Sequence, residues 1–304
     1  MEPDLSVKIA SISLKNPIIT ASGTFGYGDE YAPLVDLNRL GAVIPKGISL
    51  KPIEGNPPPR IVETAAGMLN AIGLQNVGVE VFIREKLPFL NRHTTPIIVN
   101  IFGNTEEEYG KLAHILDSQK IDGLEVNISC PNVRKGGCYF GHDPRMAFEV
   151  IRTVKRNTSL PVIAKLSPNV TDITLIAKSV QKGGADAISL INTLLGMAID
   201  VDRRKPVLRY GTGGLSGPAI RPVALRMVWQ VAQVAQIPII GIGGIVTAMD
   251  ALEFMIAGAS AVEIGTAHFV HPRSSLDIID ELNQYLRRHG IARITDIVGS
   301  LKNE

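Results

Sequence analysis

The sequence predicts an α/β protein of the (β/α)8 TIM-barrel class, with an N-terminal β-hairpin and long loops over the carboxyl-terminal face of the barrel. Eight short β-branched runs alternate with longer amphipathic segments, a pattern typical of βαβ units around a parallel sheet. No Gly-x-Gly-x-x-Gly motif opens a βα unit, which disfavours an open dinucleotide-binding sheet. A chain of 304 residues suits one continuous core of this class, so we expect residues 1–304 to form a single domain.

The expected strands are short runs rich in isoleucine and valine. They cover residues 17–23, 41–47, 96–102, 123–129, 161–167, 187–193, 238–244 and 261–267. The expected helices are amphipathic, and they cover residues 77–92, 106–119, 144–157, 172–183, 221–235, 248–258 and 274–289. Two small runs, 7–10 and 12–14, predict the hairpin across the barrel floor, and Thr171 and Thr247 are expected to cap helices.

Composition excludes several classes of protein. Lysine and arginine number 31 against 29 acidic residues, without a basic run that could follow a nucleic acid backbone. The longest apolar stretch, residues 237–246, is about half of what a membrane-spanning helix needs. Two cysteines, Cys130 and Cys138, are too few for a disulfide scaffold or an iron–sulfur cluster. We therefore expect a cytoplasmic protein that binds neither nucleic acid nor membrane.

Polar residues gather where the strands end, which is where the active sites of (β/α)8 barrels lie. They are Ser22, Lys46 with Gly47, Asn100, Asn127, Lys165, and Asn192 with Thr193. Lysines and asparagines in otherwise apolar strands are costly to bury unless they meet a polar ligand or one another. The sequence therefore predicts a hydrogen-bonding ligand in the barrel mouth. For Lys165 alone, a salt bridge without a ligand role is the alternative.

The last two strands end in small residues that expose the main chain, Gly243–Gly244 and Gly265–Thr266. The loops after these strands commonly form a phosphate site in this fold, because exposed N–H groups and a hydroxyl can hold an oxyanion. One such pair alone would be explained by a tight turn, but two pairs at these strands favour a phosphorylated ligand. Gly217, in a glycine-rich loop after the sixth strand, is expected to close over the same ligand.

Cys130 follows the fourth strand, between Asn127 and Asn132. A lone cysteine is usually a small buried apolar residue, yet this one lies in a loop at the expected active face. Its thiol could act as a base near neutral pH if nearby donors or a cation lowered its pKa. A metal site is disfavoured, because Cys130 and Cys138 lack a histidine partner at a familiar spacing. Two long loops, 51–76 and 130–143, are expected to wall the site.

Five motifs together resemble those of the class 1 dihydroorotate dehydrogenases, and most closely the FMN-binding subunit of class 1B. They are residues 45–49 (PKGIS), 70–76 (NAIGLQN), 126–132 (VNISCPN), 213–218 (GGLSGP) and 241–244 (GIGG). The resemblance covers nearly the whole chain. It implies one FMN per chain, and it implies that Cys130 removes a proton from C5 of dihydroorotate while hydride leaves C6 for the flavin.

The resemblance also implies roles for individual residues. The residues expected to contact FMN are Ser22, Lys46, Gly47, Asn100, Asn127, Lys165, Ile191, Gly217, Gly243, Gly244, Gly265 and Thr266. The residues expected to hold the substrate are Lys46, Asn70, Ala71, Ile72, Gly73, Leu74, Asn127, Asn192 and Thr193. No metal site is expected.

Resemblance to class 1B further implies a partner subunit that carries FAD and a [2Fe-2S] cluster and passes electrons to NAD, in a heterotetramer built on a dimer of this chain. A class 1A-like enzyme that uses fumarate, or another FMN barrel that reduces pyrimidines, is the enzymatic alternative. A regulatory barrel that binds a phosphorylated ligand without catalysis is the alternative from another class of protein.

Overall fold

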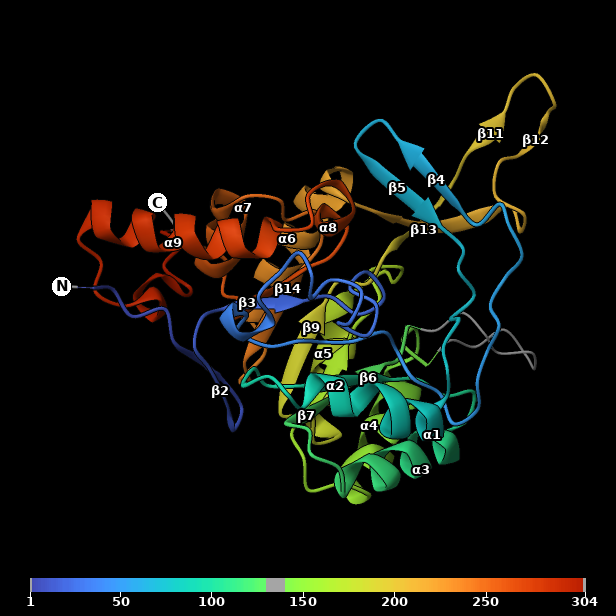
Figure 1. Ribbon diagram of the computed structural model, residues 1–304, viewed down its shortest axis with the longest axis horizontal. Helices are drawn as coiled ribbons and strands as arrows, with labels where there is room; N and C mark the ends of the chain where they lie inside the picture. The colour runs from blue at the N-terminus through green and yellow to red at the C-terminus, as the bar shows by residue number, and fades with distance from the viewer. Residues whose placement is uncertain (1, 130–139, 303–304) are drawn as a thin grey trace.

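The computed structural model describes residues 2–129 and 140–302, and its centre is a parallel sheet curled into a barrel (Figure 1). The order of the strands in this sheet is β3-β15-β14-β9-β8-β7-β6. Their bounds are β3 (Ile18–Thr20), β6 (Ile98–Ile101), β7 (Gly123–Asn127), β8 (Val162–Lys165), β9 (Ala187–Leu190), β14 (Ile239–Ile242) and β15 (Ala261–Ile264). Each of these strands is buried along its whole length, as expected for a parallel sheet covered by helices. Seven of the eight predicted strands are thereby confirmed.

The eighth predicted strand, residues 41–47, lies between the two edge strands and closes the barrel. It pairs through isolated parallel bridges, Ile19 with Ala42 on the β3 side and Val43 with Ile97 on the β6 side. A regular ladder does not form here because Pro45 has no N–H to donate. The next N–H, that of Lys46, donates instead to the carbonyl of Gly26 at 2.7 Å. The predicted (β/α)8 class is therefore confirmed.

Helices follow most strands and cover the outside of the barrel (Figure 1). They are α3 (Glu106–Asp117), α4 (Pro144–Arg156), α5 (Ile173–Lys182), α6 (Arg221–Ala232), α7 (Ala248–Ile256), α8 (Ala267–Val270) and α9 (Ser274–His289), with single turns η1 (Leu37–Arg39), η3 (Pro218–Ile220) and η4 (Ile294–Ile297). The predicted helix 77–92 is interrupted: α1 (Val79–Val81) and α2 (Leu87–Leu90) flank a π-helical turn, η2 (Phe82–Lys86). Pro88 explains this, because it cannot donate the hydrogen bond that a continuous α-helix would need.

A second, four-stranded sheet lies outside the barrel, where the sequence predicted only loops. It contains β4 (Ile61–Thr64), β5 (Gly67–Asn70), β10 (Leu194–Met197) and β13 (Thr212–Ser216), in the order β10-β13-β5-β4. A small hairpin, β11 (Ile199–Asp200) and β12 (Lys205–Pro206), projects beyond it (Figure 1). The sheet thus joins the loop after the second barrel strand to the loop after β9.

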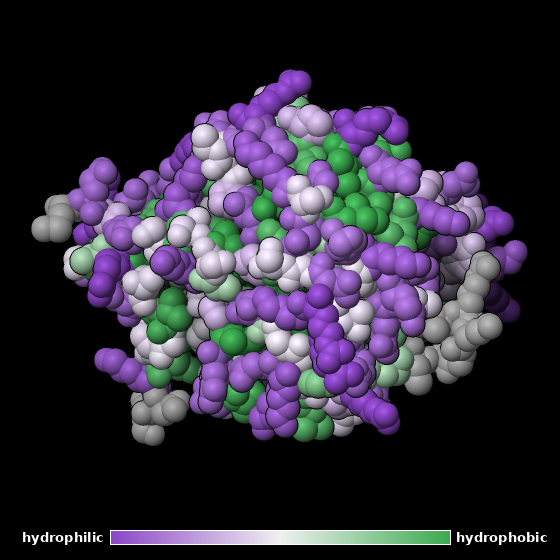
Figure 2. Space-filling model, turned by 90° about the horizontal axis from the view of Figure 1, so that it is seen from below, coloured by the Kyte–Doolittle hydropathy of each residue, from purple (hydrophilic) through white to green (hydrophobic). Residues whose placement is uncertain are grey.

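The predicted N-terminal hairpin is present as β1 (Val7–Ile9) and β2 (Ile12–Leu14), which pair antiparallel. Ile12 lies against the start of β7, since a Cβ added to Gly123 would come within 2.9 Å of its side chain. The hairpin therefore packs at the amino-terminal end of the barrel. From below, the surface is mainly hydrophilic, with one larger apolar area at the upper right and several small ones (Figure 2). No helix in residues 2–129 and 140–302 has the length and apolar character needed to cross a membrane.

The two predicted helix caps have different outcomes. Thr247 caps α7 as expected: its side chain accepts from Asp250 N at 3.2 Å, while the Asp250 carboxylate accepts from Thr247 N at 2.9 Å. The prediction for Thr171 is wrong, because α5 begins one residue later. Asp172 is its cap, and the carboxylate of Asp172 accepts from Thr174 N at 2.8 Å.

We expect Asp172→Ala to lower the free energy of unfolding by about 1 kcal/mol, because the first turn of α5 loses the acceptor for an N–H group. Equilibrium urea unfolding, followed by circular dichroism, measures this. Thr171→Ala is the matched control and should change the free energy by less than about 0.5 kcal/mol. An equal loss in the two variants would contradict the assignment of the cap.

Candidate active site

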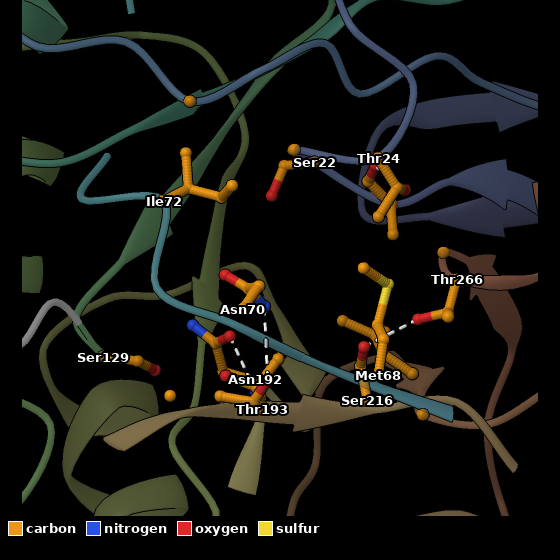
Figure 3. Close-up of a pocket in the computed structure, with 18 of the residues that line it drawn as sticks. Ser22, Thr24, Met68, Asn70, Ile72, Ser129, Asn192, Thr193, Ser216 and Thr266 are labelled. Atoms are coloured by element: carbon orange, nitrogen blue, oxygen red, sulfur yellow. Dashed lines mark hydrogen bonds between the residues drawn. The ribbon is translucent and has the colours of Figure 1, made fainter. Parts of the chain in front are cut away.

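A cavity of about 710 Å³ opens at the carboxyl-terminal ends of the barrel strands. The barrel supplies one part of its wall and the four-stranded sheet supplies the other. Figure 3 shows Ser22 and Thr24 on one side of the space, facing Asn70, Asn192 and Thr193 across it. A volume of this size falls within the range of small-molecule and cofactor sites.

All the predicted ligand contacts within the described residues line this one cavity. Those expected for the cofactor are Ser22, Lys46, Gly47, Asn100, Asn127, Lys165, Ile191, Gly217, Gly243, Gly244, Gly265 and Thr266. Those expected for the substrate add Asn70, Ala71, Ile72, Gly73, Leu74, Asn192 and Thr193. Cys130, the predicted base, lies outside the described residues, and the preceding Ser129 lines the cavity.

Lys165 forms the floor of the cavity from the end of β8, and it is held from below by two carboxyl groups. Its Nζ donates to Glu263 Oε2 at 2.9 Å and to the oxygens of Glu125 at 3.3 and 3.2 Å. Asn100, also on the floor, donates to Glu125 at 2.5 Å. Burial alone would lower the pKa of Lys165, but the carboxylate of Glu125 and the acceptor oxygen of Glu263 raise it above its ordinary value. The ammonium group is therefore charged. Lys165 both forms a salt bridge and lines the cavity, so the two interpretations of this residue are compatible.

Cations dominate the electrostatics of the cavity. Lys46, Arg60 and Lys165 line it, and no aspartate or glutamate among residues 2–129 and 140–302 does so. Burial, with a smaller effect of the Arg60 guanidinium, lowers the pKa of Lys46. Within the described part of this wall, Lys46 and Arg60 have no carboxylate partner. They favour an anionic ligand, because its negative charge would offset their mutual repulsion and the cost of their burial.

Main-chain atoms dominate at the ends of β14 and β15. Gly243 and Gly244 have φ angles of 130° and 74°, which favour glycine, and a Cβ at Gly244 would lie 2.7 Å from the carbonyl oxygen of Gly217. Beside them, Thr266 Oγ1 donates to Ser216 Oγ at 2.8 Å (Figure 3). The short helix α8 begins directly after Thr266, at the place where (β/α)8 barrels commonly hold phosphate.

Amide side chains are fixed at the other end of the cavity. Asn127 Oδ1 accepts from Asn192 Nδ2 at 3.3 Å and from Ser129 N at 3.1 Å. Asn70 Nδ2 donates to the carbonyl of Gly214 at 3.3 Å, which connects β5 to β13. These contacts hold the amide groups in one orientation, so they present fixed donors and acceptors to a polar ring.

Several cavity residues were not predicted. Arg60, Gln75, Ser167 and Asn169 belong to this group. Arg60 Nη2 donates to Gln75 Oε1 at 2.8 Å, so the loop that contains both is held together beside the cavity. A signal for Arg60 exists in the sequence, since it is a lone arginine between the proline run 57–59 and the motif at 70–76.

Among the described residues, no group of three histidine, cysteine or acidic side chains has the arrangement of a metal site.

Comparisons with known proteins agree with this geometry. The family model described as dihydroorotate dehydrogenase matches residues 4–286. The dihydroorotate dehydrogenase B (NAD(+)) catalytic subunit of Geotalea uraniireducens is 60% identical over 301 residues, covering 99% of both chains. The subunits of the same name from Pelobacter propionicus and Geobacter sulfurreducens are 60% and 58% identical, over 303 and 302 residues, covering 99% of this chain and 100% and 99% of theirs. The chain therefore belongs to the dihydroorotate dehydrogenase family and groups with its class 1B members.

Proposed function

We propose that this chain oxidises (S)-dihydroorotate to orotate, a step of de novo pyrimidine synthesis, with FMN held in the cavity. The observation that carries the proposal is a cavity lined by Lys46, Arg60 and Lys165 without a carboxylate in the described residues. FMN and the substrate are both anions, so this wall matches both. The names of relatives that are about 60% identical over their full length support the same reaction.

The residues present fit FMN. The crowded glycines and Thr266 suit its phosphate, because a side chain at Gly244 would fill the space beside Gly217. Lys165 and Asn100, fixed to Glu125 below the floor, suit the polar edge of the flavin ring. When bound, FMN supplies the acceptor for two electrons. Lys165 then stabilises the negative charge that reduction brings, without having to move.

The substrate would occupy the part of the cavity that the amide groups line. Lys46 and Arg60 suit its carboxylate, while Asn70, Asn127 and Asn192 suit the ring carbonyl and N–H groups. Cys130 follows Ser129, which lines the same part, and we assign to its thiolate the removal of the proton from C5.

We also propose a partner subunit that carries FAD and a [2Fe-2S] cluster and passes electrons on to NAD, in a cytoplasmic heterotetramer built on a dimer of this chain. The chain has only Cys130 and Cys138, fewer than the four thiolates that such a cluster usually takes. The relatives are named catalytic subunits, which supports a separate subunit for electron transfer. Exposed apolar side chains near the cavity, Leu195 at 69% and Val270 at 87% exposure, provide surface for contacts between subunits.

The test of the function is anaerobic reduction of the purified chain by dihydroorotate, followed by absorbance in the flavin bands. The reduced protein is then offered NAD, fumarate or a quinone, with and without the partner subunit. We expect bleaching by dihydroorotate, and recovery with NAD only in the presence of the partner. Recovery with fumarate by the chain alone would support the class 1A alternative, and a colourless protein would contradict the proposal as a whole.

We expect Cys130→Ala to keep FMN but to slow its reduction by dihydroorotate by a factor of about 10² or more, because a general base is lost. Cys130→Ser should be impaired less severely. Stopped-flow absorbance under anaerobic conditions measures the rate. Cys138→Ala is the matched control and should reduce at the rate of the wild type. A Cys130→Ala variant that also did so would remove Cys130 from the mechanism.

We expect Lys165→Ala to weaken FMN binding by about tenfold or more, because a charge-assisted contact on the cavity floor is lost. Fluorescence titration of the apoprotein with FMN measures the affinity. Lys178→Ala, an exposed lysine on α5, is the control and should bind as tightly as the wild type. Unchanged affinity and redox behaviour in Lys165→Ala would count against its contact with the flavin.

We expect Arg60→Gln to weaken the binding of orotate by about tenfold, because the cavity loses one of the cations that face the substrate carboxylate. Orotate binding is measured from the perturbation of the flavin spectrum. Arg204→Gln, at an exposed position before β12, should leave it unchanged. If Arg60→Gln bound orotate as the wild type does, Lys46 alone would account for recognition of the carboxylate.

A further inference from the structure

Two carboxyl groups lie below the cavity floor, and the proposed reaction uses neither of them directly. Glu125 on β7 and Glu263 on β15 are 0% and 1% exposed, and both contact the ammonium group of Lys165 on β8. In the sheet, β14 and β9 separate β15 from β8. Glu263 therefore reaches Lys165 across the interior of the barrel, and the three side chains form one buried cluster beneath the flavin site.

The two carboxyl groups have unequal surroundings. Glu125 accepts from Lys165 at both oxygens, from Ser189 Oγ at 2.7 Å and from Asn100 Nδ2 at 2.5 Å. This number of donors suits an ionised carboxylate. Glu263 accepts from Lys165 alone, at Oε2, and its buried Oε1 has no hydrogen-bond partner in the part of the chain that the structure describes.

The charges in the cluster also indicate that Glu125 is ionised and that Glu263 is not. Lys165 with one carboxylate is neutral, whereas a second carboxylate would leave a net negative charge among buried strands. The side chains of Lys165, Glu125 and Glu263 are 6%, 0% and 0% exposed, so solvent cannot screen that charge. An uncompensated buried charge costs several kcal/mol, and such a group takes up a proton instead.

We propose that Glu263 is a neutral carboxylic acid, which keeps the Lys165–Glu125–Glu263 cluster uncharged and acts as a positioning residue for Lys165 beneath the flavin. Its Oε2 remains free to accept from Lys165. The role toward the flavin rests on the proposed binding of FMN, whereas the protonation of Glu263 does not. Burial, with the added effect of the neighbouring Glu125 carboxylate, raises the pKa of Glu263 well above its ordinary value, in agreement with this assignment.

The neutral cluster has a consequence for the redox chemistry. A second negative charge so close to Lys165 would give the cluster a net negative charge and disfavour the electron-rich reduced flavin. A proton on Glu263 leaves the field of Lys165 balanced by Glu125 alone. The relative affinity of the chain for reduced and oxidised FMN, and with it the midpoint potential, therefore depends on the charge of this cluster.

The first test uses the chain without FMN. Infrared spectroscopy at neutral pH should show the C=O stretch of a buried carboxylic acid in the wild type, and Glu263→Gln should lose it. Ser189→Ala removes a donor to Glu125 and keeps both glutamates, so it should retain a carboxylic acid band. Absence of the band in the wild type, or a band that persists unchanged in Glu263→Gln, would overturn the assignment of the proton to Glu263.

The second test measures the midpoint potential of bound FMN. Glutamine matches a protonated glutamate in charge and shape, so Glu263→Gln should change the ratio of affinities for reduced and oxidised FMN by less than about threefold. The double variant Glu125→Gln with Glu263→Gln leaves Lys165 without a counter-ion. It should raise that ratio by about tenfold or more, which is about 30 mV for a two-electron couple.

An increase of tenfold in Glu263→Gln alone would mean that both glutamates are ionised, and it would overturn the proposal. Failure of this single variant to fold would do the same, since it preserves the proposed charge. If the double variant does not fold, the single variant and the infrared band still decide. A chain that shows the acid band but binds no FMN would contradict the proposed function and leave the assignment of the proton intact.

Discussion

The charge of a buried lysine is the constraint around which the centre of this structure is built. Lys165 lies at the end of β8, where water is nearly excluded, and an unpaired ammonium group there would be very costly. Glu125 from the adjacent strand and Glu263 from across the barrel meet this requirement. Because the three groups come from different strands, their contacts depend on closure of the barrel and on the register of its parallel strands.

The cluster beneath the floor also orients the groups above it. Asn100 and Lys165 both contact Glu125, so one carboxylate fixes two side chains that line the cavity. The upper wall has a different origin, since it comes from β5 and β13 of the four-stranded sheet, where Asn70 is tied to Gly214. The ligand site thus lies between a rigid barrel interior and a separate sheet, an arrangement that can bind a cofactor below and a substrate above.

The sequence predicted the barrel well because its strands and helices differ in hydrophobic period. The polar residues and glycines that follow each apolar run located the strand ends, and these ends line one cavity. The four-stranded sheet was missed, because β4, β5, β10 and β13 are short and partly exposed, and pairing of β5 with β13 joins residues far apart in the chain. Glu125 and Glu263 were visible as single charges inside apolar runs, but only the closed barrel shows that they meet at Lys165.

Stability alone does not account for the buried cluster. Breaking a buried ion pair is costly, yet replacing the whole of it with well-packed apolar residues is often neutral or stabilising. The other buried side chains of the barrel strands are mainly aliphatic, so the fold could have accommodated an apolar layer at this level too. The polar layer lies directly below the cavity, which is lined by cations and main-chain donors. We therefore attribute it to the proposed flavin, because a charge fixed beneath a redox cofactor needs a counter-ion of equal and opposite charge and no more.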